Sequence, residues 1–128
     1  MKKIKNFILL ICGMMIMIYS CYYEYPPAPL PIEPDDVSFN THILPLLVTK
    51  CSTPACHDGT KAPNLLAENA YNSLKSGGYY NLTFPNESIL LVSVNEGIGG
   101  LLMPPSGALS QLEKDLLMVW IAKGAPND

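Results

Sequence analysis

Two cysteines and a histidine, Cys51, Cys56 and His57, constrain this chain more than any other feature. The pattern Cys-x-x-Cys-His attaches a c-type haem: the thiols bond to the haem vinyl groups and the adjacent histidine lies against the iron. Here four residues separate the two cysteines, where the usual pattern has two. The segment therefore predicts haem attachment on the condition that the intervening residues bulge outward.

The N-terminal segment 1–20 has the pattern of an export signal. Three lysines precede an apolar run over 7–19 that is too short to span a bilayer comfortably. The sequence Ile18-Tyr19-Ser20-Cys21 that ends it resembles the lipobox of bacterial lipoproteins. This resemblance implies that Cys21 becomes the first residue of the mature chain and carries lipid. An ordinary cleaved signal with an incidental cysteine is the alternative.

The charge of the mature chain excludes one class of partner. The whole sequence carries a net charge of −3, but removal of the signal leaves five lysines, no arginine and eleven acidic residues, a charge near −6. Nucleic acid binding is excluded because it needs clustered basic residues to neutralise phosphates. We expect instead protein partners with basic faces.

Three regions follow from composition. Residues 1–20 are the signal, 21–36 are the lipidated cysteine and a proline-rich tether, and 37–128 are the folded domain. The tether contains five prolines and should be extended, with a reach of roughly 45 Å.

The pattern of the folded region predicts an all-α domain. A first helix begins at Ser38 or Asn40 and ends at Lys50, and Pro45 is tolerated in its opening turns. Shorter helices are expected over 68–76 and from 86 or 87 to 94, and the glycines and prolines of 95–109 predict a loop. The last helix starts at the capping box Ser110-Gln111-Leu112-Glu113 and ends before Gly124. Its apolar face is predicted at helical spacing: Leu112, Leu116, Leu117, Trp120 and Ile121.

The iron of a haem held by His57 needs a second ligand, and Met103 is the best candidate. Met103 precedes Pro104-Pro105, which favours extended backbone and a stiff loop. Met118 belongs to the last helix and is expected to pack in the core. His42 lies in the first helix, and a His42/His57 pair is the alternative, with a lower redox potential.

Taken together, these motifs resemble a known family. Cys51, Cys56 and His57, then Met103-Pro104-Pro105 after a glycine-rich loop, then the terminal helix, resemble the small class I-type cytochrome c domains of bacterial lipoproteins. The resemblance covers essentially all of 37–128. It implies an all-α domain wrapped around one covalent haem c, with crossing first and last helices and electron transfer as its activity. It also implies thioether bonds at Cys51 and Cys56 and axial ligation by His57 and Met103.

Residues beyond the ligands are candidates for supporting the haem. A ligating imidazole donates its other N–H to an acceptor, and the carbonyls around Ala62-Pro63 are near in sequence. Tyr79, Tyr80 and Trp120 could hydrogen-bond haem propionates or simply pack.

The sequence favours a membrane-tethered electron carrier, not an enzyme, that meets redox partner proteins outside the cytoplasm. The absence of an aspartate after Cys21 favours the outer membrane. One alternative is a haem-based module that senses a gas after displacement of Met103. Another is a haemless surface adaptor closed by a Cys51–Cys56 disulfide, for which the geometry is possible. A zinc site from two cysteines and two histidines matches no usual spacing.

Overall fold

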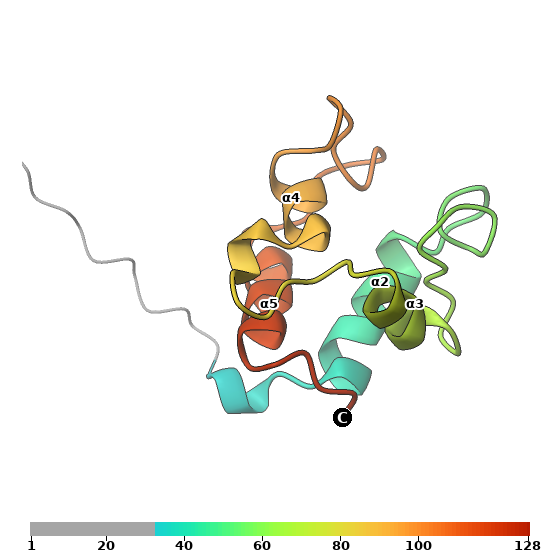
Figure 1. Cartoon of the computed structure of the whole chain (residues 1–128). Helices are drawn as coiled ribbons and strands as arrows, with labels where there is room; N and C mark the ends of the chain where they lie inside the picture. The colour runs from blue at the N-terminus through green and yellow to red at the C-terminus, as the bar shows by residue number, and fades with distance from the viewer. Residues whose placement is uncertain (1–32) are drawn as a thin grey trace, which may run out of the picture.

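The structure is a computed structural model that describes residues 33–128. The predicted signal, the predicted lipidation site Cys21 and most of the predicted tether lie outside these residues. The described chain is helical, and its only β-bridge is the isolated pair Ile98 and Leu101. The expectation of an all-α domain is therefore confirmed (Figure 1). The elements in chain order are η1 (Pro34–Asp36), η2 (Phe39–Ile43), α2 (Leu44–Lys50), α3 (Ala70–Ser76), η3 (Pro85–Glu87), α4 (Ile89–Asn95) and α5 (Gln111–Ala122).

The first helix spans the predicted range but changes geometry along its length. Ser38 caps it, because its hydroxyl oxygen accepts a hydrogen bond from the N–H of Thr41 at 3.3 Å. Its first part, η2, is a π-helix, and the α-helix α2 follows with Pro45 in its first turn. In a regular α-helix the ring of Pro45 would clash with the carbonyl four residues earlier, so wider turns before the proline relieve that clash.

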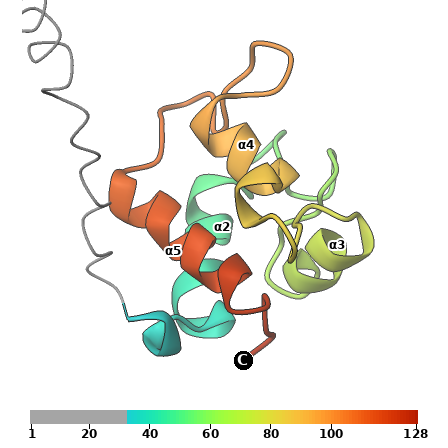
Figure 2. The same cartoon turned by 60° about the vertical axis from the view of Figure 1, so that its left-hand side comes forward.

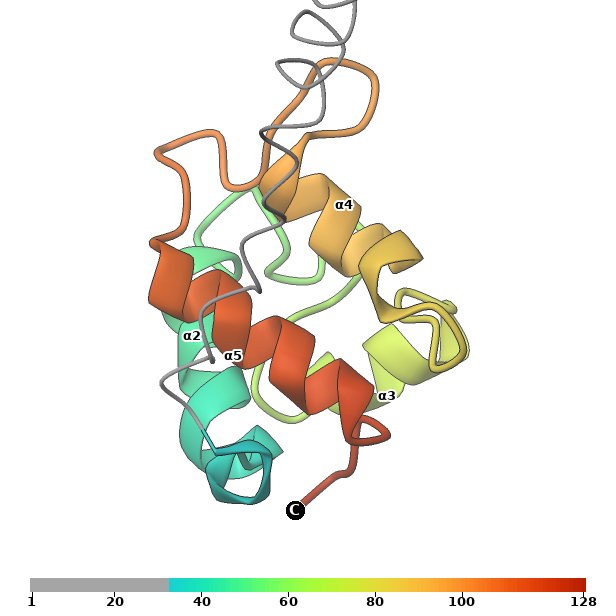
Figure 3. The ribbon, with the colours of Figure 1, turned by 90° about the vertical axis from the view of Figure 1, so that its left-hand side faces the viewer.

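The last helix, α5, lies across the first helical segment, as the resemblance implied (Figures 2 and 3). Its capping box is present, since Ser110 and Glu113 hydrogen-bond in both directions. Trp120 is fully buried, with its ring centroid 5.3 Å from Phe39 and 5.4 Å from Tyr80. These aromatic contacts join α5 to η2 and to the segment before α4.

The apolar face of α5 differs from the prediction at two positions. Leu112 is 54% exposed, although the helical spacing placed it in the core. Val119 is buried, although the spacing placed it outside the apolar face. The first turn of α5 therefore extends past the core, whereas its C-terminal half is covered on more than one side. The spacing of apolar residues predicts which side of the helix faces the core, but it does not predict how far the neighbouring elements extend along the helix.

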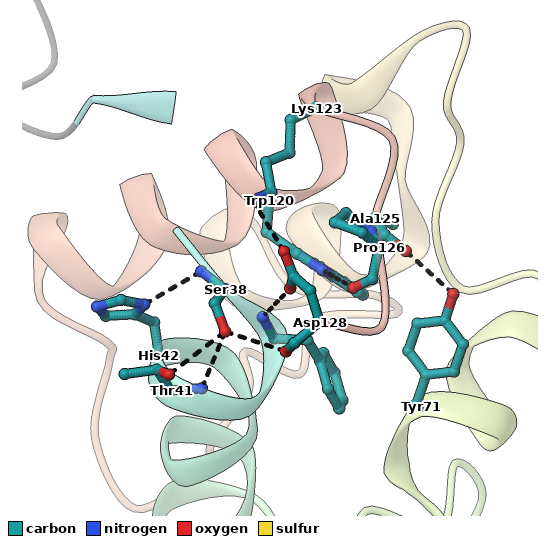
Figure 4. Close-up of polar contacts among 10 residues, drawn as sticks. Ser38, Thr41, His42, Tyr71, Trp120, Lys123, Ala125, Pro126 and Asp128 are labelled. Carbon is teal, nitrogen blue, oxygen red and sulfur yellow. Dashed lines mark hydrogen bonds and ion pairs between the residues drawn. The ribbon is translucent and has the colours of Figure 1, made fainter. Parts of the chain in front are cut away.

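The segment after α5 folds back onto the start of the first helix (Figure 4). The Asp128 carboxylate accepts from the backbone N–H of Phe39 at 2.8 Å, and its main-chain oxygen accepts from Asn40 N–H at 2.9 Å and from the Ser38 hydroxyl at 3.0 Å. These bonds satisfy N–H groups that have no partner inside the helix. The bond from Phe39 is the main reason that the pKa of Asp128 is lowered.

The same segment accepts hydrogen bonds from two aromatic side chains. The indole N–H of Trp120 donates to the carbonyl of Pro126 at 2.9 Å, and the hydroxyl of Tyr71 donates to the carbonyl of Ala125 at 3.2 Å (Figure 4). Trp120 therefore packs in the core, and its N–H is not available to a haem propionate.

The two short helices follow their predictions to within two residues. α3 ends at Ser76, directly before Gly77 as expected, but starts at Ala70. The helix expected from 86 or 87 is divided into η3 and α4 at Ser88, whose buried hydroxyl oxygen accepts from the N–H of Asn81 at 2.9 Å. No helix within residues 33–128 has the length and apolar character needed to cross a bilayer.

Candidate functional site

A single cavity of about 600 Å³ brings the predicted site residues together. Cys51, Cys56, His57 and Met103 all line it, although Met103 is distant in sequence from the other three. Its volume lies in the range of sites that hold cofactors and other small molecules. The sequence-derived site is therefore one physical location, built from the turn after α2 and the loop before α5.

The turn between the cysteines shows how the longer spacing is accommodated. Cys51 ends α2, and its carbonyl accepts from the N–H of His57 at 3.1 Å, so the chain closes on itself six residues later. Cys56 is held by a bond from its N–H to the carbonyl of Thr53 at 3.0 Å. Thr53, Pro54 and Ala55 are exposed. The intervening residues bulge outward, as the sequence required, and both cysteines still reach the cavity.

The imidazole of His57 is oriented by the main chain that follows it. Its Nδ1 lies 3.0 Å from the carbonyl oxygen of Pro63, one of the acceptors expected from the sequence. With the proton on Nδ1, the histidine donates to that carbonyl and keeps an unprotonated Nε2. Its own carbonyl accepts from the N–H of Leu65 at 2.7 Å. These two bonds orient the ring of His57 and fix its backbone, with Nδ1 directed at the Pro63 carbonyl.

Met103 is fixed by a contact that sequence reasoning did not foresee. Its N–H donates to the carbonyl of Ser93 in α4 at 2.9 Å, and the buried Pro104 follows it. The chain reaches this position through a tight turn in which Gly97 has a φ of +81°. A Cβ at Gly97 would lie 2.8 Å from the main chain of Leu101, so only glycine fits there. The turn at Gly97 therefore carries the thioether back alongside α4.

The cavity walls are mostly apolar. α4 contributes Ile89, Leu90 and Val94, and the loop after it contributes Ile98 and Leu101. Ile89, Ile98 and Leu101 remain about half exposed, although each lines the cavity. The sequence analysis missed this wall, but the apolar spacing within 89–94 was a signal that could have indicated it.

The charge at the cavity has the opposite sign to the net charge of −3 of the whole sequence. Two lysines, Lys50 and Lys61, line the cavity within the described residues, and no carboxylate does. Lys50 also forms an ion pair of 3.5 Å with Glu113. Burial raises the pKa of the Cys51 thiol to about 11, with further contributions from Cys56 and Glu113. Cys51 is therefore protonated at neutral pH, and a protonated thiol is slow to exchange with disulfides.

The alternative ligands lie elsewhere. His42 is not part of the cavity lining, and its Nδ1 accepts from the N–H of Ser38 at 3.1 Å. Met118 packs against the core, as predicted. Tyr79 lines the cavity, whereas Tyr80 packs edge-on against Trp120.

Among the described residues, the two cysteines form neither a disulfide nor part of a metal-binding cluster. Cys51 and Cys56 are unpaired thiols in the structure. Among residues 33–128, no group of three or more His, Cys, Asp or Glu side chains is arranged to hold a metal ion. The four sequence-derived residues instead provide two thiols, an imidazole and a thioether at one cavity. This donor set fits an iron porphyrin with vinyl groups.

No protein-family model matches this chain, and no match was found among curated proteins or solved structures. The functional assignment therefore depends on the chemistry and geometry of the site itself.

Proposed function

We propose that this protein is a monohaem c-type cytochrome that carries single electrons outside the cytoplasm. The observation that carries the proposal is the shared cavity of Cys51, Cys56, His57 and Met103. In this proposal the protein resembles small class I-type cytochrome c domains. A lipid at Cys21 would tether it to a membrane, with the outer membrane favoured, and redox proteins would be its partners.

Each of the four residues has a defined task. The thiols of Cys51 and Cys56 would bond covalently to the haem c vinyl groups, so the cofactor cannot dissociate. His57 would present Nε2 to the iron, because Pro63 holds its Nδ1. Met103 would supply the thioether from a segment fixed to α4 through Ser93. The bound haem supplies an iron that alternates between the ferrous and ferric states.

The surrounding residues would limit what that iron can do. With both His57 and Met103 holding the iron, no ligand position would remain for a substrate, which is why we propose a carrier and not an enzyme. The apolar wall of Leu90, Val94 and Leu101 would exclude water from the porphyrin face. Methionine ligation and a dry cavity both favour a higher potential than a bis-histidine site would have.

The test is expression of the full chain in bacteria that have haem-attachment proteins. We expect a red protein whose mass exceeds that of the processed polypeptide by one haem, and the increase should survive denaturation. The double variant Cys51→Ala, Cys56→Ala should lose the increase. Met118→Leu, which changes a sulfur outside the cavity, is the matched control and should retain it. A colourless wild-type protein with no added mass would refute the proposal.

A further inference from the structure

The stretch between the two cysteines contains a conformation that needs support. Ala55 has a φ of +65°, a left-handed backbone that residues with a Cβ rarely adopt. Ala55 directly precedes Cys56 and His57, so its backbone determines where the second thiol and the imidazole point. Thr53 and Pro54 are exposed, and the bulge gains little from core packing.

The carboxylate of Asp58 holds this bulge in place. One carboxylate oxygen accepts from the N–H of Ala55 at 3.1 Å. The other oxygen accepts from the N–H of Thr60 at 3.2 Å and from the Thr60 hydroxyl at 2.6 Å. Asp58 therefore connects the backbone before Cys56 with the backbone after His57.

We propose that Asp58 is a positioning residue for covalent haem attachment, because it fixes the bulge that lets a four-residue spacing present Cys51 and Cys56 to one cavity. This inference rests on the proposed function. The thiol of each cysteine adds across one vinyl group: a carbon–sulfur bond forms, the thiol hydrogen goes to the other vinyl carbon, and the vinyl double bond becomes single. No atom leaves and no oxidant is required. Asp58 acts only on the backbone that directs Cys56.

The principal experiment compares Asp58→Ala with Glu68→Ala, which removes an exposed carboxylate outside this turn. Both are made in the full chain with haem-attachment proteins. Mass spectrometry of the haem peptide and the absorption spectrum of the pyridine derivative separate products with one thioether bond from those with two. We expect Asp58→Ala to lower the two-bond fraction by roughly three- to tenfold, the effect of one or two hydrogen bonds, while one-bond product accumulates. Glu68→Ala should match the wild type.

A chain with shortened cysteine spacing distinguishes a positioning role of Asp58 from a general stabilising role. Deletion of Pro54 and Ala55 leaves the usual two-residue spacing, Cys-Ser-Thr-Cys-His. In that chain the bulge is gone, so Asp58→Ala should have no effect on the number of bonds. In the full-length spacing, Ala55→Gly should restore much of the loss in Asp58→Ala, because glycine adopts a positive φ without strain.

A measurement on the haem-free chain provides an independent readout. Amide hydrogen exchange at Ala55 should be faster in Asp58→Ala than in Glu68→Ala, with unchanged helical circular dichroism. The inference is overturned if Asp58→Ala forms two bonds as well as the wild type does. It is also overturned if Asp58→Ala loses its helical content. The same holds if Asp58→Ala still lowers the two-bond fraction in the chain that lacks Pro54 and Ala55. A wild-type chain that takes up no haem refutes the proposed function instead, while the exchange measurement still tests the role of Asp58 in the turn.

Discussion

The two ends of this domain are built in different ways. At one end, Trp120 is buried among aromatic rings and its N–H is bonded to Pro126, while Asp128 caps the first helix (Figure 4). At the other end, two loops surround a cavity, and apolar side chains such as Leu101 remain half exposed. At the closed end, hydrogen bonds within the chain satisfy the polar groups. At the cavity end, the half-exposed apolar side chains form a wall of the kind that packs against a further apolar group.

This difference predicts where substitutions act. At the closed end they should reduce the stability of the domain itself. At the cavity end they should mainly change how the domain holds the proposed cofactor. The predictions below test that separation.

The largest effect should come from Trp120→Ala at the closed end. The indole is fully buried, so its loss leaves a cavity and should lower the free energy of unfolding by about 3–5 kcal/mol. Denaturant titration followed by circular dichroism measures the change. Leu112→Ala, an exposed position on the same helix, is the control and should stay within about 0.5 kcal/mol of the wild type. Equal effects at the two positions would contradict the assigned core.

At the cavity end, Leu101→Ser should destabilise the haem-loaded protein by roughly 1–2 kcal/mol, because the loaded cavity would bury this side chain. Leu82→Ser is the matched control. Leu82 has almost the same exposure, 54% against 50%, but does not line the cavity. Thermal melts of the two loaded variants give the comparison. If both variants melt like the wild type, Leu101 does not pack against a cofactor.

The capping box of α5 should contribute less. Ser110→Ala removes the hydroxyl oxygen that accepts from Glu113 N–H and should cost about 1 kcal/mol. Because Ser110 does not line the cavity, the loss should be equal with and without haem. Denaturant titration of both forms tests this. A loss confined to the loaded form would connect the cap to the cavity.

The smallest effect should be the pH dependence of stability that Asp128 contributes. Folding lowers the pKa of Asp128, so its contribution to stability is present above the ordinary carboxyl pKa and is lost as pH falls through the lower, folded value. Asp128→Asn should therefore melt below the wild type at neutral pH, and the gap should close in acid, below about pH 4. Melts at a series of pH values measure the gap. A gap that widens in acid would have the wrong sign.

Much of the helical layout could be predicted from sequence because local signals specify it. Ser38, the box from Ser110 to Glu113 and Gly77 determined helix ends through short-range hydrogen bonds and backbone freedom. The exposure of Leu112 could not be predicted, since it depends on how far other elements extend along α5.

In the candidate site, too, some features could be predicted from local sequence and others could not. The motif itself indicated Cys51, Cys56 and His57, and the prolines after Met103 indicated a separate loop. The wall from α4 and the bond between Met103 and Ser93 depend on tertiary packing. The fate of the Trp120 N–H also depended on a segment that returns from Ala122 onward, which no local pattern describes.

The most direct test of the central claim is the absorption of a methionine–ferric iron bond in the oxidised protein. Wild-type protein and Met118→Leu should both show this weak long-wavelength band, because the iron held beside His57 would take its second ligand from Met103. Met103→Leu should lose the band but keep the covalent haem. Persistence of the band in Met103→Leu, or its absence from the haem-loaded wild type, would contradict the account.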